Sequence, residues 1–175
     1  MSDSDRFSIH PDHALLVELI PEIRKYQELA TKHGIFDIFQ DNGGKLLQVL
    51  LLLGIRGLPG REGNDAVDDK GNEFELKSVN RFDMRGKRRS SPSFTTHHHL
   101  NPTILAKYRL VDWIFAVYSG IELEAVYLLT PTQLEPFYKR WEQKYHETGK
   151  ELNNPKIPIT FVENNAVRLY AIAQE

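Results

Sequence analysis

The sequence predicts an α/β fold of the α+β-like kind, in which a mixed central sheet is flanked by helices. Two observations predict it. Helical patterns fill residues 11–34 and 43–53 before the first strand pattern, and most of the later strand patterns are joined by short turns rather than by helices. The chain has 175 residues, 41% hydrophobic and 26% charged, which is enough for one core. We therefore expect a single domain over residues 1–175.

The first helix is expected to begin at Pro11 and to stop at Gly34. Its apolar residues recur at steps of three or four, at Leu15, Leu19, Ile23, Tyr26 and Ala30. Pro21 falls inside this pattern and either kinks the helix or splits it. The apolar stripe exceeds what one short helix needs, so it packs either on a second copy of the chain or on the chain's own core.

The second helix is predicted over residues 43–53, where six leucines and a valine cover most of its faces. We expect it to be deeply buried, with the core built around it. Residues 54–63 contain several glycines and a proline, and are expected to form a loop that leads into a β-hairpin over residues 64–80.

This hairpin carries the residues that most strongly suggest chemistry. Asp65 precedes the triplet Glu75-Leu76-Lys77 by ten residues. Side chains on a strand repeat every second residue, so Glu75 and Lys77 share one face, roughly 6.6 Å apart along the strand. Two carboxylates can hold Mg²⁺ through oxygen, and an ammonium group beside them can position or deprotonate a water that attacks a phosphodiester. The alternative is an ordinary amphipathic hairpin whose Glu and Lys form a solvated ion pair.

The length of the hairpin loop decides whether Asp65 joins this face. A two-residue loop at Lys70-Gly71 would pair Asp65 with Leu76 and point its carboxylate to the wrong side. If Asp69-Lys70-Gly71 form a three-residue loop with Gly71 in the left-handed conformation, Asp65 lies opposite Glu75. The turn chemistry then agrees with a metal site.

The rest of the chain alternates short helices and strands. Pro102 begins a helix through about Arg109, and Thr130-Pro131 start a helix that runs to about His146. Strands are expected at residues 113–118 and 121–128, and as a final pair at 157–162 and 167–173.

Composition narrows the class of function. The chain has no cysteine, so any metal must be held by oxygen or imidazole, and the lack of disulfides fits a reducing compartment. There is no run of ~18 apolar residues and the first residues do not resemble a signal peptide, so we expect no membrane association and a cytoplasmic location. No glycine-rich dinucleotide motif or phosphate loop is present, which leaves nucleotide cofactors unsupported.

Charge is unevenly distributed, although the net charge is only −2. Residues 81–89, here called the basic segment, carry five cations and one aspartate. The basic segment is either a solvated loop or an arm that contacts DNA, because phosphate contacts from Lys and Arg supply most non-specific affinity for DNA.

Three polar runs are compatible with the reading of DNA bases. The imidazoles of His97-His98-His99 can donate to guanine O6 or N7, although imidazole also binds Zn²⁺. Asn153-Asn154-Pro155 suggests a turn first, yet Asn can contact adenine at N6 and N7. Asp41 also suggests a turn first, and the alternative is acceptance of a hydrogen bond from guanine N2 in the minor groove. On residue types alone these alternatives stay open.

Taken in order along the chain, these motifs resemble the PvuII restriction endonuclease family, type II enzymes of the PD-(D/E)xK nuclease superfamily. The resemblance runs from about residue 15 to the C-terminus. It rests on residues 37–50, 60–65, 75–78, 96–99 and 153–158. It implies a restriction-endonuclease-like fold, with a catalytic β-hairpin in the mixed sheet.

The resemblance also implies a homodimer that hydrolyses double-stranded DNA at the palindrome CAGCTG, with Mg²⁺ and blunt ends, alongside a cognate DNA methyltransferase. Residues 1–42 would supply dimerisation helices, 43–110 the catalytic core with its DNA-reading arm, and 111–175 the remaining sheet and the recognition loop. By matching motif, the metal ligands are Asp65, Glu75 and the backbone carbonyl of Leu76, and Lys77 serves the attacking water. The implied base readers are His98, His99, Asn153, Asn154 and Asp41, and the implied supports of the active site are Tyr108 and Glu62.

One departure from the family is the stretch from Asn80 to Thr96, which is longer here and carries additional cations. The additional cations leave open the affinity for DNA, the salt dependence of DNA binding and the tolerance of related recognition sites. Competing functions are a structure-specific DNA-binding nuclease on the same scaffold, which would share Asp65, Glu75 and Lys77 but have no use for the base readers, and a non-catalytic DNA-binding protein on that scaffold, which would have no use for the triad. A third alternative is a His-based metal carrier.

Overall fold

The computed structural model of the chain describes residues 10–58, 64–97 and 99–173. The chain forms two compact units, Met1–Leu47 and Gln48–Glu175. Each is described here by itself, and the single domain expected over the whole chain stays a prediction.

The first unit is built on helix α1 (His13–Lys32) and the turn that follows it. Pro21 lies inside α1, which continues through it as one helix rather than splitting. A small core of Ala30, Ile38 and Leu47 closes the unit. The Gln27 side chain joins helix and turn, because its amide donates to the Ile35 carbonyl and its oxygen accepts from the Ile38 N–H.

Much of α1 keeps its apolar residues half-exposed. The exposed fractions are 57% for Leu15, 52% for Leu16, 54% for Val17 and 48% for Leu19. Single exposed apolar residues are common on proteins, but a run of them on one helix marks an interaction surface.

The second unit is organised around a mixed sheet, as predicted. In the described part of the chain this sheet has six strands in the order β1-β2-β3-β5-β6-β8. They are β1 (Arg56–Gly57), β2 (Ala66–Val67), β3 (Glu73–Asn80), β5 (Asp112–Ser119), β6 (Glu122–Leu129) and β8 (Val167–Ala171). β3 pairs with β5 in parallel, and every other neighbouring pair is antiparallel.

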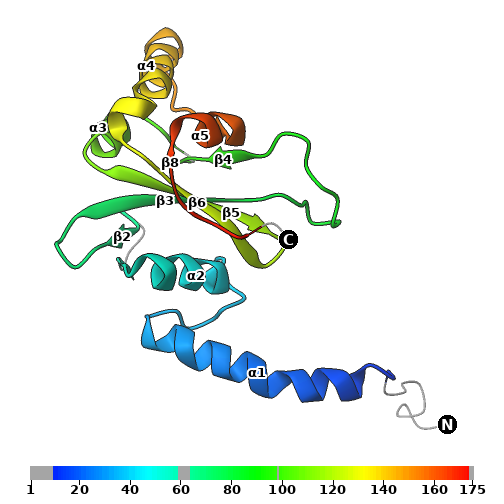
Figure 1. The fold of residues 1–175 in the computed structure, drawn as a ribbon. Helices are drawn as coiled ribbons and strands as arrows, with labels where there is room; N and C mark the ends of the chain where they lie inside the picture. Colours follow the sequence, from blue (N-terminus) through cyan, green and yellow to red (C-terminus); the bar gives the residue numbers. More distant parts are fainter. Residues whose placement is uncertain (1–9, 59–63, 98, 174–175) are drawn as a thin grey trace. The chain divides into compact units, whose positions relative to one another are not determined.

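Helices cover the sheet unequally. Helices α3 (Pro102–Tyr108), α4 (Pro131–Thr148) and α5 (Ile159–Asn165) lie together on one side, where they pack on Trp113, Phe115 and Val117 of β5 (Figure 1). The opposite face, with Ile114 and Ala116, packs on Val49 of helix α2 (Gly43–Leu53).

The expectation of a core built around α2 is therefore wrong. Leu50 is buried, but Leu51 and Leu52 are 44% and 41% exposed, and the larger core lies on the opposite face of the sheet. A leucine-rich helix buries only the face that packs on another element, and here that element is the sheet.

A second, two-stranded sheet pairs β4 (Ser93–Thr95) with β7 (Lys156–Pro158). The predicted strand pair at 157–162 and 167–173 is consequently wrong in its first half. β7 ends at Pro158, which is the N-cap of α5, and the buried Ile159 and Val162 lie three residues apart on one face of that helix. β8 pairs with β6 instead.

Candidate active site

The hairpin that leads into β3 has the predicted three-residue loop. Gly71 has φ +84°, and the Asp68 N–H donates to the Asn72 carbonyl at 3.0 Å. The Asp68 carboxylate fixes the turn by accepting from the backbone N–H groups of Lys70 and Asn72. Ala66 then lies opposite Phe74, and the Asp65 N–H donates to the Phe74 carbonyl at 3.0 Å, which holds Asp65 at the edge of β3.

The three residues Asp65, Glu75 and Lys77 converge in the structure. The Lys77 ammonium contacts the Glu75 carboxylate directly and lies 3.9 Å from Asp65 Oδ2. The Asp65 carboxylate also accepts a hydrogen bond from the Leu76 N–H at 2.8 Å. Both carboxylates therefore lie within reach of one ammonium group.

The Leu76 backbone faces the carboxylate of Asp65. In an extended strand the N–H and C=O of one residue point to the same edge. Because the Leu76 N–H is bound by Asp65, the Leu76 carbonyl is directed to the edge of β3 where Asp65 lies. A backbone oxygen and two carboxylates thus face one region.

Glu75 lies in a buried environment rather than on a solvated face. It is 4% exposed, and it is the one buried charged side chain among the residues that the structure describes. Glu75 and Lys77 lie beside Trp113 and Phe115 of the parallel strand β5, and Lys77 Nζ lies 5.8 Å from the Trp113 ring. An ordinary solvated ion pair is therefore excluded.

Tyr108, at the end of α3, completes the surroundings of Glu75 by a hydrogen bond between its hydroxyl and the Glu75 carboxylate. Burial raises the pKa of Glu75, nearby Asp65 adds to that rise, and Lys77 and Tyr108 oppose it. Burial, followed by the charges of Glu75 and Asp65, raises the pKa of Tyr108, so its hydroxyl keeps its proton at neutral pH.

Aromatic packing holds Tyr108 in place. Its ring meets Trp113 edge-on at 4.5 Å between centroids. The Tyr108 backbone carbonyl accepts from Trp113 Nε1 and from the Tyr138 hydroxyl, both at 3.3 Å. The hydroxyl that faces Glu75 is thus positioned by β5 and α4 together.

The donor set fits a hard divalent cation. Within the described residues, no group of three or more His, Cys, Asp or Glu side chains could hold a metal ion. Mg²⁺ keeps several waters and is commonly held by one or two carboxylates with substrate oxygens, which is what Asp65, Glu75 and the Leu76 carbonyl offer.

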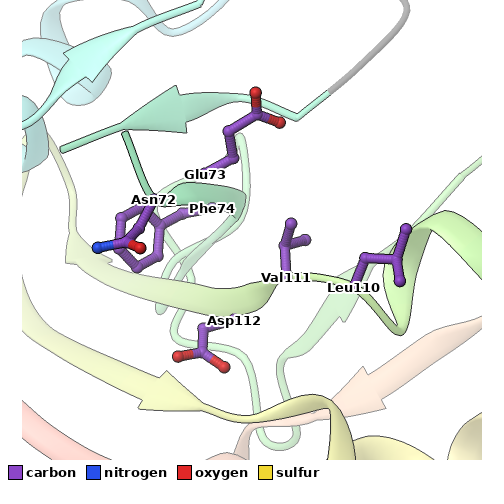
Figure 2. A pocket seen from close by; sticks show the side chains of 6 residues that line it. All are labelled: Asn72, Glu73, Phe74, Leu110, Val111 and Asp112. Atoms are coloured by element: carbon purple, nitrogen blue, oxygen red, sulfur yellow. The ribbon is translucent and has the colours of Figure 1, made fainter. Parts of the chain in front are cut away.

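A surface pocket lies beside the site, where β3 and β5 begin (Figure 2). It is lined by Asn72, Glu73, Phe74, Leu110, Val111 and Asp112. The carboxylates of Glu73 and Asp112 point in different directions in Figure 2, and Glu73 accepts a hydrogen bond from the Asn64 amide. The pocket is thus distinct from the group formed by Asp65, Glu75 and Lys77.

The second sheet brings together the two segments that were expected to read bases. β4 leads into His97–His99 and β7 follows Asn153-Asn154, and the Asn154 N–H donates to the His97 carbonyl at 3.0 Å. The buried residues Phe94 and Ile157 face each other across this sheet, and Leu100 pairs with Leu152. The two segments are therefore anchored on the main core.

Side-chain contacts orient two of the candidate base readers, His99 and Asn154. His99 Nδ1 lies 3.1 Å from the Glu151 carboxylate, which leaves Nε2 as the ring nitrogen directed elsewhere. Asn154 has a left-handed backbone with φ +50°, and its amide donates to the Asn153 side chain. His98 and Glu62 lie outside the described residues.

Asp41 belongs to the first unit. It lies with Asn42 in a turn where both have left-handed backbones, with φ +47° and +60°. Its side chain is exposed. The Asn42 carbonyl accepts from the N–H groups of Lys45 and Leu46 in the first turn of α2, while the Gly43 and Gly44 N–H groups donate to the Gln40 and Ile38 carbonyls.

A comparison with known protein families shows the class of protein. The family model described as restriction endonuclease PvuII matches residues 11–170 of the 175-residue chain. The chain belongs to the PvuII restriction endonuclease family. It is accordingly a type II restriction endonuclease, a hydrolase that acts on double-stranded DNA, and the family implies a divalent metal cofactor.

Membership of this family agrees with the rest of the structure. The mixed sheet with flanking helices is consistent with a restriction-endonuclease-like fold. Among the described helices, none is long and apolar enough to cross a membrane.

Several residues at the site could not be identified from the sequence. Trp113 backs Lys77 only because β5 runs parallel to β3, and Glu151 meets His99 only because Leu100 pairs with Leu152. Neither pairing leaves a local sequence signal. Arg109 follows Tyr108 directly and binds Glu135 and Glu142 of α4, which fixes the end of α3.

Proposed function

We propose that this member of the family is a homodimeric, site-specific deoxyribonuclease that cleaves CAGCTG to blunt ends with Mg²⁺. The observation that carries the proposal is the convergence of Asp65, Glu75 and Lys77 on β3, in the same unit as the paired segments that contain His97, His99, Asn153 and Asn154. One unit then offers both hydrolytic side chains and candidate base readers.

In this proposal, Asp65 and Glu75 hold the cation together with the Leu76 carbonyl. When bound, Mg²⁺ stabilises the negative charge that develops on the phosphate. Lys77 donates to the attacking water and orients it toward phosphorus. The water oxygen forms the new bond to phosphorus and releases a proton to solvent, while the bond to the 3′ oxygen breaks and that oxygen takes up a proton from solvent. The products carry a 5′-phosphate and a 3′-hydroxyl.

Tyr108 acts as a positioning residue through Glu75. Its hydroxyl donates to the carboxylate and favours the charged form that a metal ligand needs. Glu62 is proposed as a further support because it precedes Asp65 closely in the motif.

Base reading is assigned to the segments held by the second sheet. His98 and His99 contact guanines, Asn154 with Asn153 contacts adenine in the major groove, and Asp41 acts from the minor groove. His99 reads with Nε2, since its Nδ1 faces Glu151. Each such contact discriminates by about 1–3 kcal/mol, so a few per half-site are sufficient.

A second copy of the chain is proposed to cover the exposed apolar residues of α1. A two-fold dimer on a palindrome repeats every base contact and places one Asp65–Glu75–Lys77 group on each strand. The partner system includes a cognate methyltransferase that protects the same sequence in the host.

The proposal is tested by digesting a plasmid with one CAGCTG site, with and without Mg²⁺, and sequencing the ends. We expect Mg²⁺-dependent blunt ends at the central G/C step. Cutting at another sequence would support the nuclease activity but refute the assigned recognition sequence. No cutting with any divalent ion would favour a non-catalytic DNA-binding protein.

A further inference from the structure

The basic segment, residues 81–89, is folded and anchored at its start. The Arg81 guanidinium binds Glu124 at 2.7 Å and Glu163 at 2.9 Å, and its side chain is only 17% exposed. Its N–H also donates to the Tyr118 carbonyl. Arg81 is thus engaged within the protein by two carboxylates.

The remainder of the basic segment forms a small hairpin. Phe82 pairs with Arg88, and the Asp83 N–H donates to the Lys87 carbonyl at 2.9 Å. The Asp83 carboxylate accepts from the backbone N–H groups of Arg85 and Lys87, which fixes the turn. Backbone bonds hold this shape, so the cationic side chains are not needed for it.

Four cations are presented by this hairpin. Arg85, Lys87, Arg88 and Arg89 are all exposed. Among the described residues, the ion pairs between the basic segment and carboxylates are those of Arg81 with Glu124 and Glu163. Four cations on one short hairpin of an acidic protein create a local positive field whose natural partner is a polyanion.

The hairpin is also tied to the base-reading segments. After it, the buried Pro92 accepts a hydrogen bond from the Ile159 N–H, and the chain then enters β4 and continues to His97. The segment between β3 and β4 extends past the sheet in Figure 1. His97 is eight positions after Arg89 in the chain, so the two are at most about 28 Å apart, which is the length of about eight base pairs of duplex.

We propose that Arg85, Lys87, Arg88 and Arg89 bind phosphates of the DNA duplex outside the recognition sequence. The inference rests on the proposed function in taking duplex DNA as the partner, but not on the assigned sequence. Such contacts add affinity for any duplex that is long enough, and they make that affinity strongly dependent on salt.

The test compares Arg85→Gln/Lys87→Gln with the charge-matched control Lys139→Gln/Lys144→Gln on α4, where both lysines are exposed. Binding of duplexes with about two or about ten flanking base pairs on each side of CAGCTG is measured across salt concentrations, in EDTA to prevent cleavage. Circular dichroism checks that each variant is folded.

On the long duplex, the slope of log affinity against log salt should become shallower by about four for the hairpin variant, because each of the two protomers loses two phosphate contacts, and should stay unchanged for the control. On the short duplex the hairpin variant and the wild type should have the same slope. An unchanged slope on the long duplex, or an equal loss on both duplexes, would overturn the proposal.

A scrambled sequence separates this result from the proposed function. If the wild type binds CAGCTG and scrambled duplexes equally but the hairpin variant still loses slope, the assigned specificity fails and the hairpin contact stands. If CAGCTG is preferred but the slope does not change, the hairpin contact fails alone.

Discussion

Glu75 is held between a cation and a hydroxyl inside the protein. Its burial raises its pKa, while Lys77 and Tyr108 stabilise the charged carboxylate. A metal ligand must be ionised. Cleavage is therefore expected to fall on the acid side as Glu75 takes up a proton, at a pH above the ordinary range of a glutamate.

Tyr108→Phe tests this arrangement. Loss of the hydroxyl removes a hydrogen bond to the charged form and raises the pKa of Glu75 further, so the acid limb of the pH–rate profile should move to higher pH. Single-turnover cleavage across pH measures it.

Tyr138→Phe is the matched control, since that buried hydroxyl binds only the Tyr108 backbone carbonyl among the hydrogen bonds of the described residues. An acid limb that stays in place in Tyr108→Phe, or moves equally in both variants, would contradict the role given to Tyr108.

At the scale of single residues, the sequence allowed the shared face of Glu75 and Lys77 and the left-handed Gly71 to be predicted, because strand period and turn chemistry are local. The burial of Glu75 could not be predicted. It follows from the parallel strand β5 and from α3, which are distant in sequence.

Among the secondary-structure elements, the short sheet of β4 and β7 has the clearest functional consequence. It joins residues 93–95 to residues 156–158 and so places the His97–His99 and Asn153-Asn154 segments side by side. Strands of three residues carry too little pattern to be recognised in a sequence, which is why this pairing was not predicted.

Asn154 offers a test at this scale because two substitutions distinguish the effect of its backbone conformation from the effect of its side chain. Its φ of +50° disfavours alanine by roughly 1–2 kcal/mol but suits glycine. We expect Asn154→Ala and Asn154→Gly both to lower discrimination between CAGCTG and a site altered at the adenine by roughly 10- to 100-fold.

Only Asn154→Ala should lower the free energy of unfolding. Relative kcat/KM values and chemical denaturation measure the two effects. Retained discrimination in Asn154→Gly would show that the loop backbone, and not the amide, does the reading.

The molecule as a whole shows which parts of a fold are encoded locally. The mixed sheet and most of the helices were predicted, and α4 begins at the Thr130 capping box and ends before Gly149, as its local signals indicate. Helix α5 and the ion pairs of Arg81 were missed, since both depend on tertiary packing.

The exposed residues of α1 lead to a prediction about assembly. Leu16→Lys/Leu19→Lys should shift a dimer to a folded monomer, because both side chains are half-exposed in the chain and would be buried by a second copy. Sedimentation equilibrium measures the mass. Leu110→Lys, at an 81% exposed position of the second unit, should leave the dimer intact. A wild-type chain that sediments as a monomer at micromolar concentration would contradict the proposed homodimer.

The central claim is that hydrolysis and sequence reading use separate residues. The most direct measurement is cleavage and binding of the same CAGCTG duplex by Lys77→Ala, beside the exposed-lysine control Lys139→Ala. We expect the cleavage rate to fall at least about 100-fold while specific binding is retained, since Lys77 acts on the water and not on the bases. Loss of specific binding by a folded Lys77→Ala protein, or cleavage at the wild-type rate, would contradict this division of roles.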